Sequence, residues 1–134
     1  MSSRRMRGAG LSRAKVRAIK DIASKASTGV VLARRVVARL GDDEIVARLT
    51  AARGVGRWTV EMLLIFTLGR KDVLPAGDYG VRDGYRAAYG LRALPSPQAL
   101  LEYGERWRPY RTTAAWYLWR AAEHAKARKA TKRA

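Results

Sequence analysis

A short turn near the middle of the chain has the composition of an anion-binding site. Gly54, Val55 and Gly56 separate a helical segment that starts near residue 42 from a second one over residues 58–68. Because glycine reaches positive φ without a Cβ clash, the two glycines let the backbone turn sharply. The first N–H groups of the second helix then have no partner within the helix, and such a helix start binds anions. A plain helix–turn–helix corner with a glycine cap explains the turn about equally well.

A carboxylate follows this second helix after one loop. Asp78 lies in a turn bounded by Pro75 and Gly77. An aspartate directly before a helical segment is a good N-cap, and the residue taken alone favours that role. Asp72 lies earlier in the same loop, and we interpret it as structural.

Composition indicates what the anion is. The chain has 134 residues with 28 Lys and Arg against 11 Asp and Glu, a formal net charge of +17. Such an excess predicts a polyanionic partner, and in this chain the expected anion is a nucleic-acid phosphate. A membrane is the rival partner, but no apolar run reaches membrane-spanning length. The absence of cysteine excludes disulfides, zinc–thiolate sites and an iron–sulfur cluster, and it suits a reducing compartment. The single histidine, His124, is expected to be solvated, so no metal site is predicted from side chains.

The elements that position these residues are helical throughout, and we predict an all-α helical bundle of one domain over residues 11–125. Residues 1–10 form a basic, flexible N-terminus, and residues 126–134 form a loose basic tail. Ser12 is the predicted N-cap of a helix that ends near Ser27, with an apolar stripe that includes Ile19 and Ile22. Residues 30–32 have a strand-like composition, whereas residues 33–40 have helical spacing. The helix over 58–68 is apolar nearly all round, which predicts burial in the middle of the bundle. Further helices are expected over 79–90, 98–104 and 109–128.

These motifs together resemble the helix-hairpin-helix DNA glycosylase superfamily, and within it the 3-methyladenine-DNA glycosylase II branch. Gly54, Val55, Gly56 and Thr59 match the family hairpin, and Asp78 follows at the family's spacing. The Trp-Arg-Pro-Tyr-Arg run at 107–111 and Trp119 extend the likeness, which covers about residues 10–123. The hairpin departs from the family pattern at two positions: Arg53 replaces a proline, and Val60 replaces an alanine.

The resemblance implies roles for particular residues. An aspartate at the position of Asp78 stabilises the sugar cation as the N-glycosidic bond breaks, or activates the attacking water. Trp119 stacks on the extruded base, since an indole face attracts a cationic methylated purine. Trp58 stands where glycosylases with lyase activity have a nucleophilic lysine, so the resemblance implies a monofunctional, water-using enzyme. The remaining predicted pocket residues are Tyr79, Trp116 and Trp58 itself, with core packing or surface anchoring as the alternative for Trp116.

The resemblance also implies the partner. Double-stranded DNA is expected to contact the hairpin through Arg53, Gly54, Val55, Gly56, Arg57 and Thr59. Arg111 is similar to a family arginine that contacts phosphate or pairs with a carboxylate, and both alternatives stay open. No cofactor is expected, although the hairpin backbone leaves room for a monovalent cation. We expect a monomer, in the cytoplasm of a bacterium or the nucleus of a eukaryote.

The predicted function is therefore that of a DNA-repair hydrolase that releases alkylated purines in base excision repair. Family members have more chain before the counterpart of Leu11, including one pocket wall and a residue that wedges into the DNA. The chain is expected to correspond to the C-terminal part of the family's catalytic region, as a truncated or minimal form. Since base flipping costs a few kcal/mol, the alternative is a non-catalytic helix-hairpin-helix module that binds DNA. A weaker alternative is a basic protein with an RNA partner.

Overall fold

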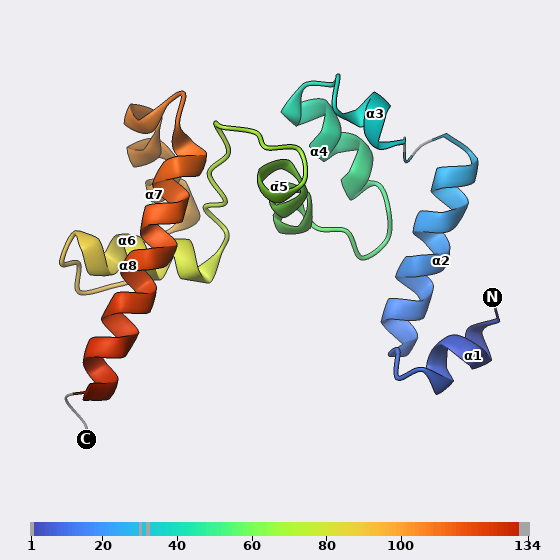
Figure 1. The fold of residues 1–134 in the computed structure, drawn as a ribbon, viewed down its shortest axis with the longest axis horizontal. Helices are drawn as coiled ribbons and strands as arrows, with labels where there is room; N and C mark the ends of the chain where they lie inside the picture. The colour runs from blue at the N-terminus through green and yellow to red at the C-terminus, as the bar shows by residue number, and fades with distance from the viewer. Residues whose placement is uncertain (1, 30, 32, 132–134) are drawn as a thin grey trace. The chain divides into compact units, whose positions relative to one another are not determined.

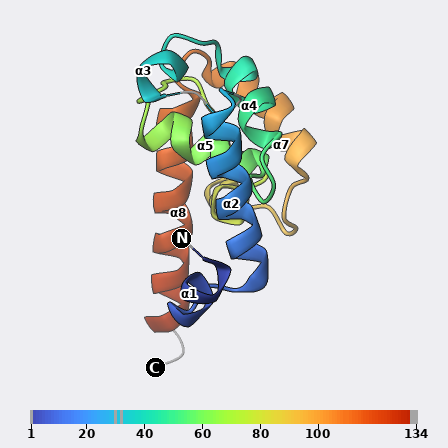
Figure 2. The same ribbon diagram turned by 90° about the vertical axis from the view of Figure 1, so that its right-hand side faces the viewer.

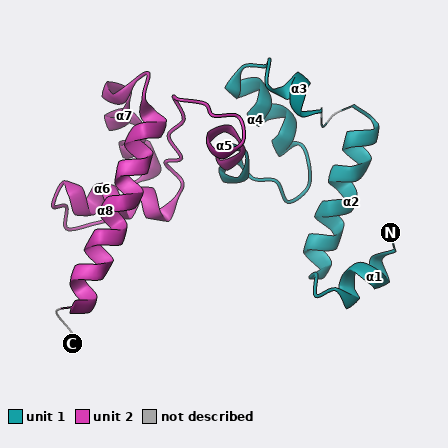
Figure 3. Ribbon diagram, viewed as in Figure 1, with its two compact units in different colours: residues 1–60 teal, residues 61–134 magenta. Residues whose placement is uncertain are grey.

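The computed structural model describes residues 2–29, 31 and 33–131. These residues form helices, turns and loops without a strand, which confirms the predicted all-α fold (Figure 1). The chain divides into two compact units, Met1–Val60 and Glu61–Ala134 (Figure 3). The boundary between the two units falls within the helix Arg57–Phe66.

In its described part, the first unit contains α1 (Ser3–Gly8), α2 (Arg13–Ser27), α3 (Arg34–Val37), α4 (Asp42–Thr50) and the beginning of α5 (Arg57–Phe66). The side chain of Ser12 accepts a hydrogen bond from the backbone N–H of Lys15 at 3.2 Å, as the predicted N-cap requires. Three acids in the first turn of α4 complement its dipole. The apolar residues buried in this unit are Met6, Val16, Val37, Ile45, Ala52 and Val60.

Several sequence expectations for this unit differ from the structure. Residues predicted to be flexible form α1, because Ser2 caps the helix and Met6 is only 7% exposed. Helix α1 lies beside the N-terminal end of α2 and contacts it (Figures 1 and 2). In α2, Ile19 is 40% exposed, and the buried residue is Val16, which the predicted stripe omits. The helical spacing over 33–40 yields only the four-residue helix α3. Met1, and Val30 and Leu32 of the strand-like stretch, lie outside the described residues.

The second unit contains the rest of α5, then α6 (Tyr79–Ala88), α7 (Pro97–Gly104), the 3₁₀ helix η1 (Glu105–Trp107) and α8 (Arg111–Thr131). Its core joins the loop before α6 to α6, α7 and α8 through Leu74, Ala76, Val81, Tyr85, Leu100, Ala115 and Leu118. Helices α6 and α8 pack closely against each other, and α6 approaches the α8 backbone at Gly84. This pairing carries Asp78, at the start of α6, to the side of α8.

Two helices of the second unit correct the sequence predictions. Helix α5 was predicted to be buried all round, but Phe66 at its C-terminal end is 56% exposed. Helix α8 continues to Thr131, so residues 126–131 of the predicted loose tail are helical. Residues 132–134 lie outside the described part. Among the described residues, no helix is both long enough and apolar enough to cross a membrane.

Candidate active site

The hairpin between α4 and α5 belongs to the first unit. The N–H of Val55 donates to the carbonyl oxygen of Ala52 at 3.1 Å and closes the turn. The carbonyl oxygen of Gly56 accepts a hydrogen bond from the N–H of Val60 at 3.3 Å. Gly56 therefore directly precedes the first turn of α5 and accepts its first helical hydrogen bond. The first α5 residues, Arg57, Trp58 and Thr59, are exposed. The hairpin therefore presents an exposed helix start of the type that binds phosphate.

A residue that the sequence analysis missed holds this turn. The carboxylate of Asp21, on α2, accepts a hydrogen bond from the backbone N–H of Arg53 at 2.6 Å. The same carboxylate forms an ion pair with Lys25 at 2.7 Å. The hydrogen bond from Lys25, followed by that from Arg53, lowers the pKa of Asp21. The only hint in the sequence is that Asp21 is the single acid in a helix that is otherwise basic.

The two glycines of the hairpin play different roles, which corrects the expectation that both take positive φ. Gly54 has a φ of +77°, whereas Gly56 has no positive φ. A Cβ on Gly54 would lie 2.9 Å from the Cβ of Ala18 on α2, whereas a Cβ on Gly56 would have no other atom within 4 Å. Gly54 thus allows both the left-handed backbone and the approach of α2.

We expect Gly54→Ala to destabilise the protein and Gly56→Ala to be nearly neutral. A left-handed backbone costs a residue with a Cβ about 1–2 kcal/mol, and the contact with Ala18 adds to this cost. The measurement is the melting temperature of both variants by circular dichroism. Equal melting temperatures would contradict the assignment of the turn conformation to Gly54.

The second candidate group is the Asp78 carboxylate in the second unit. Its Oδ1 accepts a hydrogen bond from the N–H of Val81 at 2.8 Å, which is the predicted N-cap of α6. The same oxygen accepts a second hydrogen bond from Nε1 of Trp119, at 2.9 Å. A Cβ on Gly80 would lie 3.0 Å from Cδ1 of Trp119 and 3.1 Å from Oδ1 of Asp78, so glycine leaves room for this pair. The half-buried carboxylate is therefore fixed against the indole.

Two aromatic rings pack against the indole of this pair. Phe66 of α5 stacks on Trp119 with ring centroids 5.9 Å apart. Trp116 meets both Phe66 and Trp119 edge to face, at 5.5 Å and 5.7 Å. Phe66 is 56% exposed and Trp116 48%, so these two rings form, with Trp119, an open aromatic surface rather than core. Phe66 is a further member of this surface that the sequence analysis assigned to the core.

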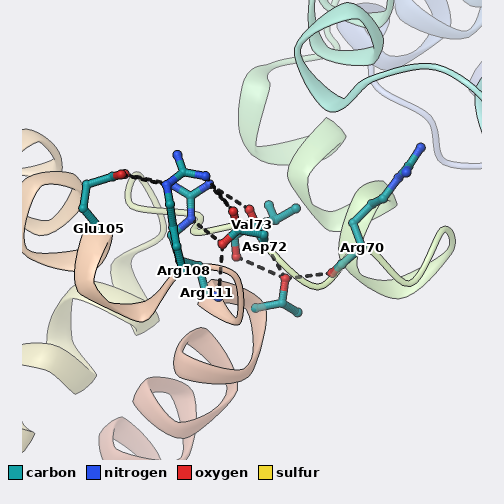
Figure 4. A network of polar contacts seen from close by, with 7 residues as sticks. Arg70, Asp72, Val73, Glu105, Arg108 and Arg111 are labelled. Atoms are coloured by element: carbon teal, nitrogen blue, oxygen red, sulfur yellow. Dashed lines mark hydrogen bonds and ion pairs between the residues drawn. The ribbon is translucent and has the colours of Figure 1, made fainter.

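A network of ion pairs fixes the loop that leads to Asp78 (Figure 4). Asp72 accepts hydrogen bonds from Nη1 of Arg108 at 2.6 Å and from Nε of Arg111 at 2.7 Å. Glu105 pairs with the same two arginines, at 2.7 Å and 3.2 Å. The hydroxyl group of Thr112 accepts from the N–H of Val73 at 3.0 Å and donates to the carbonyl oxygen of Arg70 at 2.8 Å. These contacts join the loop after α5 to the start of α8.

The network pairs Arg111 with carboxylates, which is one of the two alternatives for this residue, and a phosphate contact stays a prediction. The side chain of Arg111 is 13% exposed, and its guanidinium pairs with carboxylates and also donates to the carbonyl oxygen of Asp72 at 2.9 Å. Asp72 is structural, as predicted. Arg111 thus acts on the site by positioning the loop that ends at Asp78.

The chain is similar in sequence and in fold to proteins that are already known. It is 43% identical over 118 residues to DNA-3-methyladenine glycosylase 1 of Schizosaccharomyces pombe, across 88% of this chain and 52% of that protein. The structure of the S. pombe 3-methyladenine DNA glycosylase in complex with abasic DNA matches with a TM-score of 0.82 and 44% identity, across 89% of this chain and 58% of that one. The chain is a homologue of the 3-methyladenine DNA glycosylases. A crystal structure of the DNA-3-methyladenine glycosidase of Bacillus halodurans agrees, with a TM-score of 0.82 and 35% identity across 91% of this chain and 56% of that one.

Two further findings bound this relationship. No protein-family model matches the chain. The chain spans about half the length of the curated relatives named here, 52% of DNA-3-methyladenine glycosylase 1 of S. pombe.

Within this glycosylase homologue, the structure brings together only part of the predicted site. Asp78, Trp119 and Trp116 are neighbours in the second unit, and Tyr79 follows Asp78 directly. Trp58 is 52% exposed and belongs to the first unit with the rest of the hairpin. The roles of Trp58 and of the hairpin residues therefore stay predictions. His124 is exposed, as expected.

The ion-pair network makes the stability of this homologue depend on pH. Burial opposes ionisation of Asp72, but hydrogen bonds from Arg111 and the charges of Arg111 and Arg108 outweigh it and lower the pKa of Asp72. The hydrogen bond from Arg108 lowers the pKa of Glu105. A carboxyl group whose pKa is depressed by folding stabilises the protein above its unfolded pKa, about 3.9 for aspartate. That contribution is lost as the pH falls through the lower pKa of the folded state.

We expect Asp72→Asn to lower the free energy of unfolding at neutral pH by about 1–2 kcal/mol, because charge-assisted hydrogen bonds are lost at a partly exposed site. The difference from the wild type should shrink as the pH falls below about 4. Urea unfolding across this pH range measures it. Glu123→Gln is the control and should change stability little, because the ion pair of Glu123 with Arg120 on α8 is largely exposed. A difference between wild type and Asp72→Asn that does not vary with pH would contradict the role of the Asp72 charge.

Proposed function

We propose that this protein is a DNA-repair hydrolase that cleaves the N-glycosidic bond of alkylated purines, 3-methyladenine among them, in double-stranded DNA. The observation that carries the proposal is the fixed pair of Asp78 and Trp119, with Nε1 of the indole 2.9 Å from Oδ1 of the carboxylate. A negative charge and an electron-rich aromatic surface thus lie side by side, in a chain that is homologous to glycosylases.

The geometry suits the cleavage of a cationic base. The face of Trp119, with Phe66 and Trp116 beside it, attracts a methylated purine through a cation–π contact. The C1′–N bond breaks with its electron pair on the purine, which leaves as a neutral base and therefore needs no proton from the protein. The Asp78 carboxylate stabilises the positive charge that develops on the sugar. Water adds to C1′ and gives a proton to solvent, or to Asp78 as it attacks.

Several features prepare the carboxylate for this step. Oδ1 already accepts two hydrogen bonds, from Val81 and Trp119, so the carboxylate cannot rotate freely. The ion pairs of Asp72 with Arg108 and Arg111 fix the loop before it. A preorganised charge stabilises a transition state without reorganising as the reaction proceeds. We propose no cofactor for this hydrolysis, since water is the only co-reactant.

We propose that duplex DNA binds through backbone phosphates at the exposed start of α5. The formal net charge of +17 and the hairpin with Gly54 at positive φ support this partner. Because counterions are released when phosphates are neutralised, the logarithm of the affinity should fall linearly with the logarithm of the salt concentration. Titration of a labelled duplex at several salt concentrations measures the slope. An affinity that does not change with salt would exclude phosphate contacts.

The decisive experiment is a glycosylase assay on methylated duplex DNA. Abasic sites left by base release are cleaved with alkali and counted, and released 3-methyladenine is identified by chromatography. The proposal predicts release of the base without a covalent enzyme–DNA adduct at the hairpin, because Trp58 offers no amine. If the protein binds the duplex and releases no base, the alternative of a non-catalytic DNA-binding module is correct.

A further inference from the structure

Two cavities lie between α6 and α8 in the described part of the second unit, away from Asp78. One, of about 480 Å³, is lined by Ala88, Tyr89, Trp107, Ala114, Tyr117 and Leu118. The other, of about 330 Å³, has cations in its lining, namely Arg86, Arg128 and Lys129. Neither lining includes Asp78 or the aromatic residues beside it. These cavities are therefore separate from the candidate active site.

The two cavities share one flank of α8. With about 100° of rotation per residue, Ala114, Leu118, Ala125 and Lys129 project within about 60° of one another. Trp116 and Trp119 project to the other side of the helix, roughly 140–200° away from Ala114. Along the helix axis, Leu118 of the first cavity and Ala125 of the second are about 10 Å apart. The aromatic and basic cavities thus follow each other along a single surface, to which we refer as the α6/α8 flank.

Exposed rings give the aromatic cavity its chemistry. Tyr117 is 74% exposed and Tyr89 46%. The Tyr89 ring is held by Tyr85 and Tyr103, with centroids at 4.6 Å and 5.2 Å, and Tyr103 in turn packs against Trp107 at 5.4 Å. A held ring loses little conformational freedom when a planar ligand stacks on it. Nucleobases stack on such rings whatever their sequence, because every base has a π face.

The basic cavity supplies the complementary charge. The guanidinium of Arg86 is paired with Asp83 at 2.7 Å, so the uncompensated charge comes from Arg128 and Lys129, both exposed. A cationic patch beside a stacking surface is the arrangement with which proteins bind single strands. A duplex offers phosphates but keeps the faces of its internal bases covered by stacking.

We propose that the α6/α8 flank is a second nucleic-acid site, which binds an unpaired nucleotide of single-stranded DNA. The base stacks in the aromatic cavity against Tyr117 and Tyr89, and a phosphate of the same strand binds Arg128 and Lys129. This site goes beyond the proposed hydrolysis, and it needs neither the hairpin nor Asp78. In a glycosylase homologue it would hold a single-stranded segment while duplex DNA occupies the hairpin.

The test is a titration of the full chain with a short fluorescein-labelled deoxythymidine oligonucleotide, followed by anisotropy. Tyr117→Ala should weaken binding at least about fivefold, and Tyr117→Phe should retain it because stacking needs only the ring. Tyr110→Ala is the matched control, since Tyr110 is 61% exposed and lines neither cavity. The double variant Arg128→Ala/Lys129→Ala should weaken binding more than Lys15→Ala/Arg17→Ala, which removes two charges from α2. Equal losses in the two double variants, or full affinity in Tyr117→Ala, would overturn the proposal.

Two competitions distinguish this site from other occupants. Unlabelled duplex DNA should leave the oligonucleotide bound to the wild-type chain, because the two nucleic acids occupy different sites. The same result is expected for Asp21→Asn, which changes the carboxylate that holds the hairpin turn at Arg53. Displacement of the oligonucleotide by one equivalent of duplex would place it at the hairpin and overturn the proposal. An oligoglutamate peptide should not compete. If the peptide displaces the oligonucleotide and its own binding requires Tyr117, the flank binds an acidic protein segment, and the nucleic-acid assignment is wrong.

Discussion

Asp78→Asn should reduce base release from methylated duplex DNA by about a hundredfold or more, which corresponds to a loss of about 3 kcal/mol of transition-state stabilisation. Asparagine preserves the size of the side chain and its capping ability. Its carbonyl oxygen can still accept the hydrogen bonds that Val81 and Trp119 donate to Oδ1 at 2.8 Å and 2.9 Å. The full negative charge beside the sugar is lost, so the chemical step should slow while the fold survives.

Three measurements on wild type and Asp78→Asn separate the roles of this residue. Single-turnover release of 3-methyladenine reports the chemical step, the melting temperature reports capping, and duplex affinity reports binding. Affinity should be retained or rise slightly, because a charge that repels phosphate is removed. If both proteins release the base equally fast, Asp78 only caps α6. If neither releases base while both bind DNA, the protein is a binding module, and the Asp78 pair carries no chemistry in this chain.

Gly84→Ala should be among the most destabilising single changes in the second unit. A Cβ at this position would overlap the carbonyl oxygen of Leu118 and lie 2.5 Å from its carbonyl carbon. Both atoms belong to the backbone of α8, so no side-chain rotation relieves the clash and the two helices must separate. We expect a loss of about 3 kcal/mol or more, at the upper end of what overpacking costs, and a melting temperature lower by roughly 10 °C or more.

The matched control is Gly77→Ala in the same unit. Gly77 has no positive φ, and a Cβ there would have no other atom within 4 Å. Its melting temperature should stay within about 2 °C of the wild type, since no contact changes. A Gly84→Ala variant as stable as this control would contradict the close packing of α6 on α8. Because α8 carries Trp119, Gly84→Ala should also slow base release at temperatures at which the protein is still folded.

Local sequence patterns determined the elements and the candidate positions. Helical periodicity, the serine and aspartate caps and the two glycines of the hairpin each act over a few residues, so the amino-acid order alone predicts them. Ser12 and Asp78 are found as caps in the structure. The all-α class follows from the same periodicity, and the structural interpretation of Asp72 agrees with its ion pairs. The error near the N-terminus arises because the Ser2 cap and the buried Met6 stabilise α1, whose composition suggested flexibility. The other error is at the end of α8, which continues to Thr131.

Contacts between distant residues were decided only by the tertiary structure. Asp21 reaches Arg53 across 32 positions, Asp72 reaches Arg111 across 39, and Asp78 reaches Trp119 across 41. No local pattern encodes these pairings, because each depends on how helices pack. The sequence therefore left Arg111 with two alternatives, and only the packing shows its ion pairs with carboxylates. Phe66 is a second example. The apolar pattern of its helix predicted a place in the core, but the end of α5 turns this ring toward the exposed aromatic surface, where it stacks on Trp119.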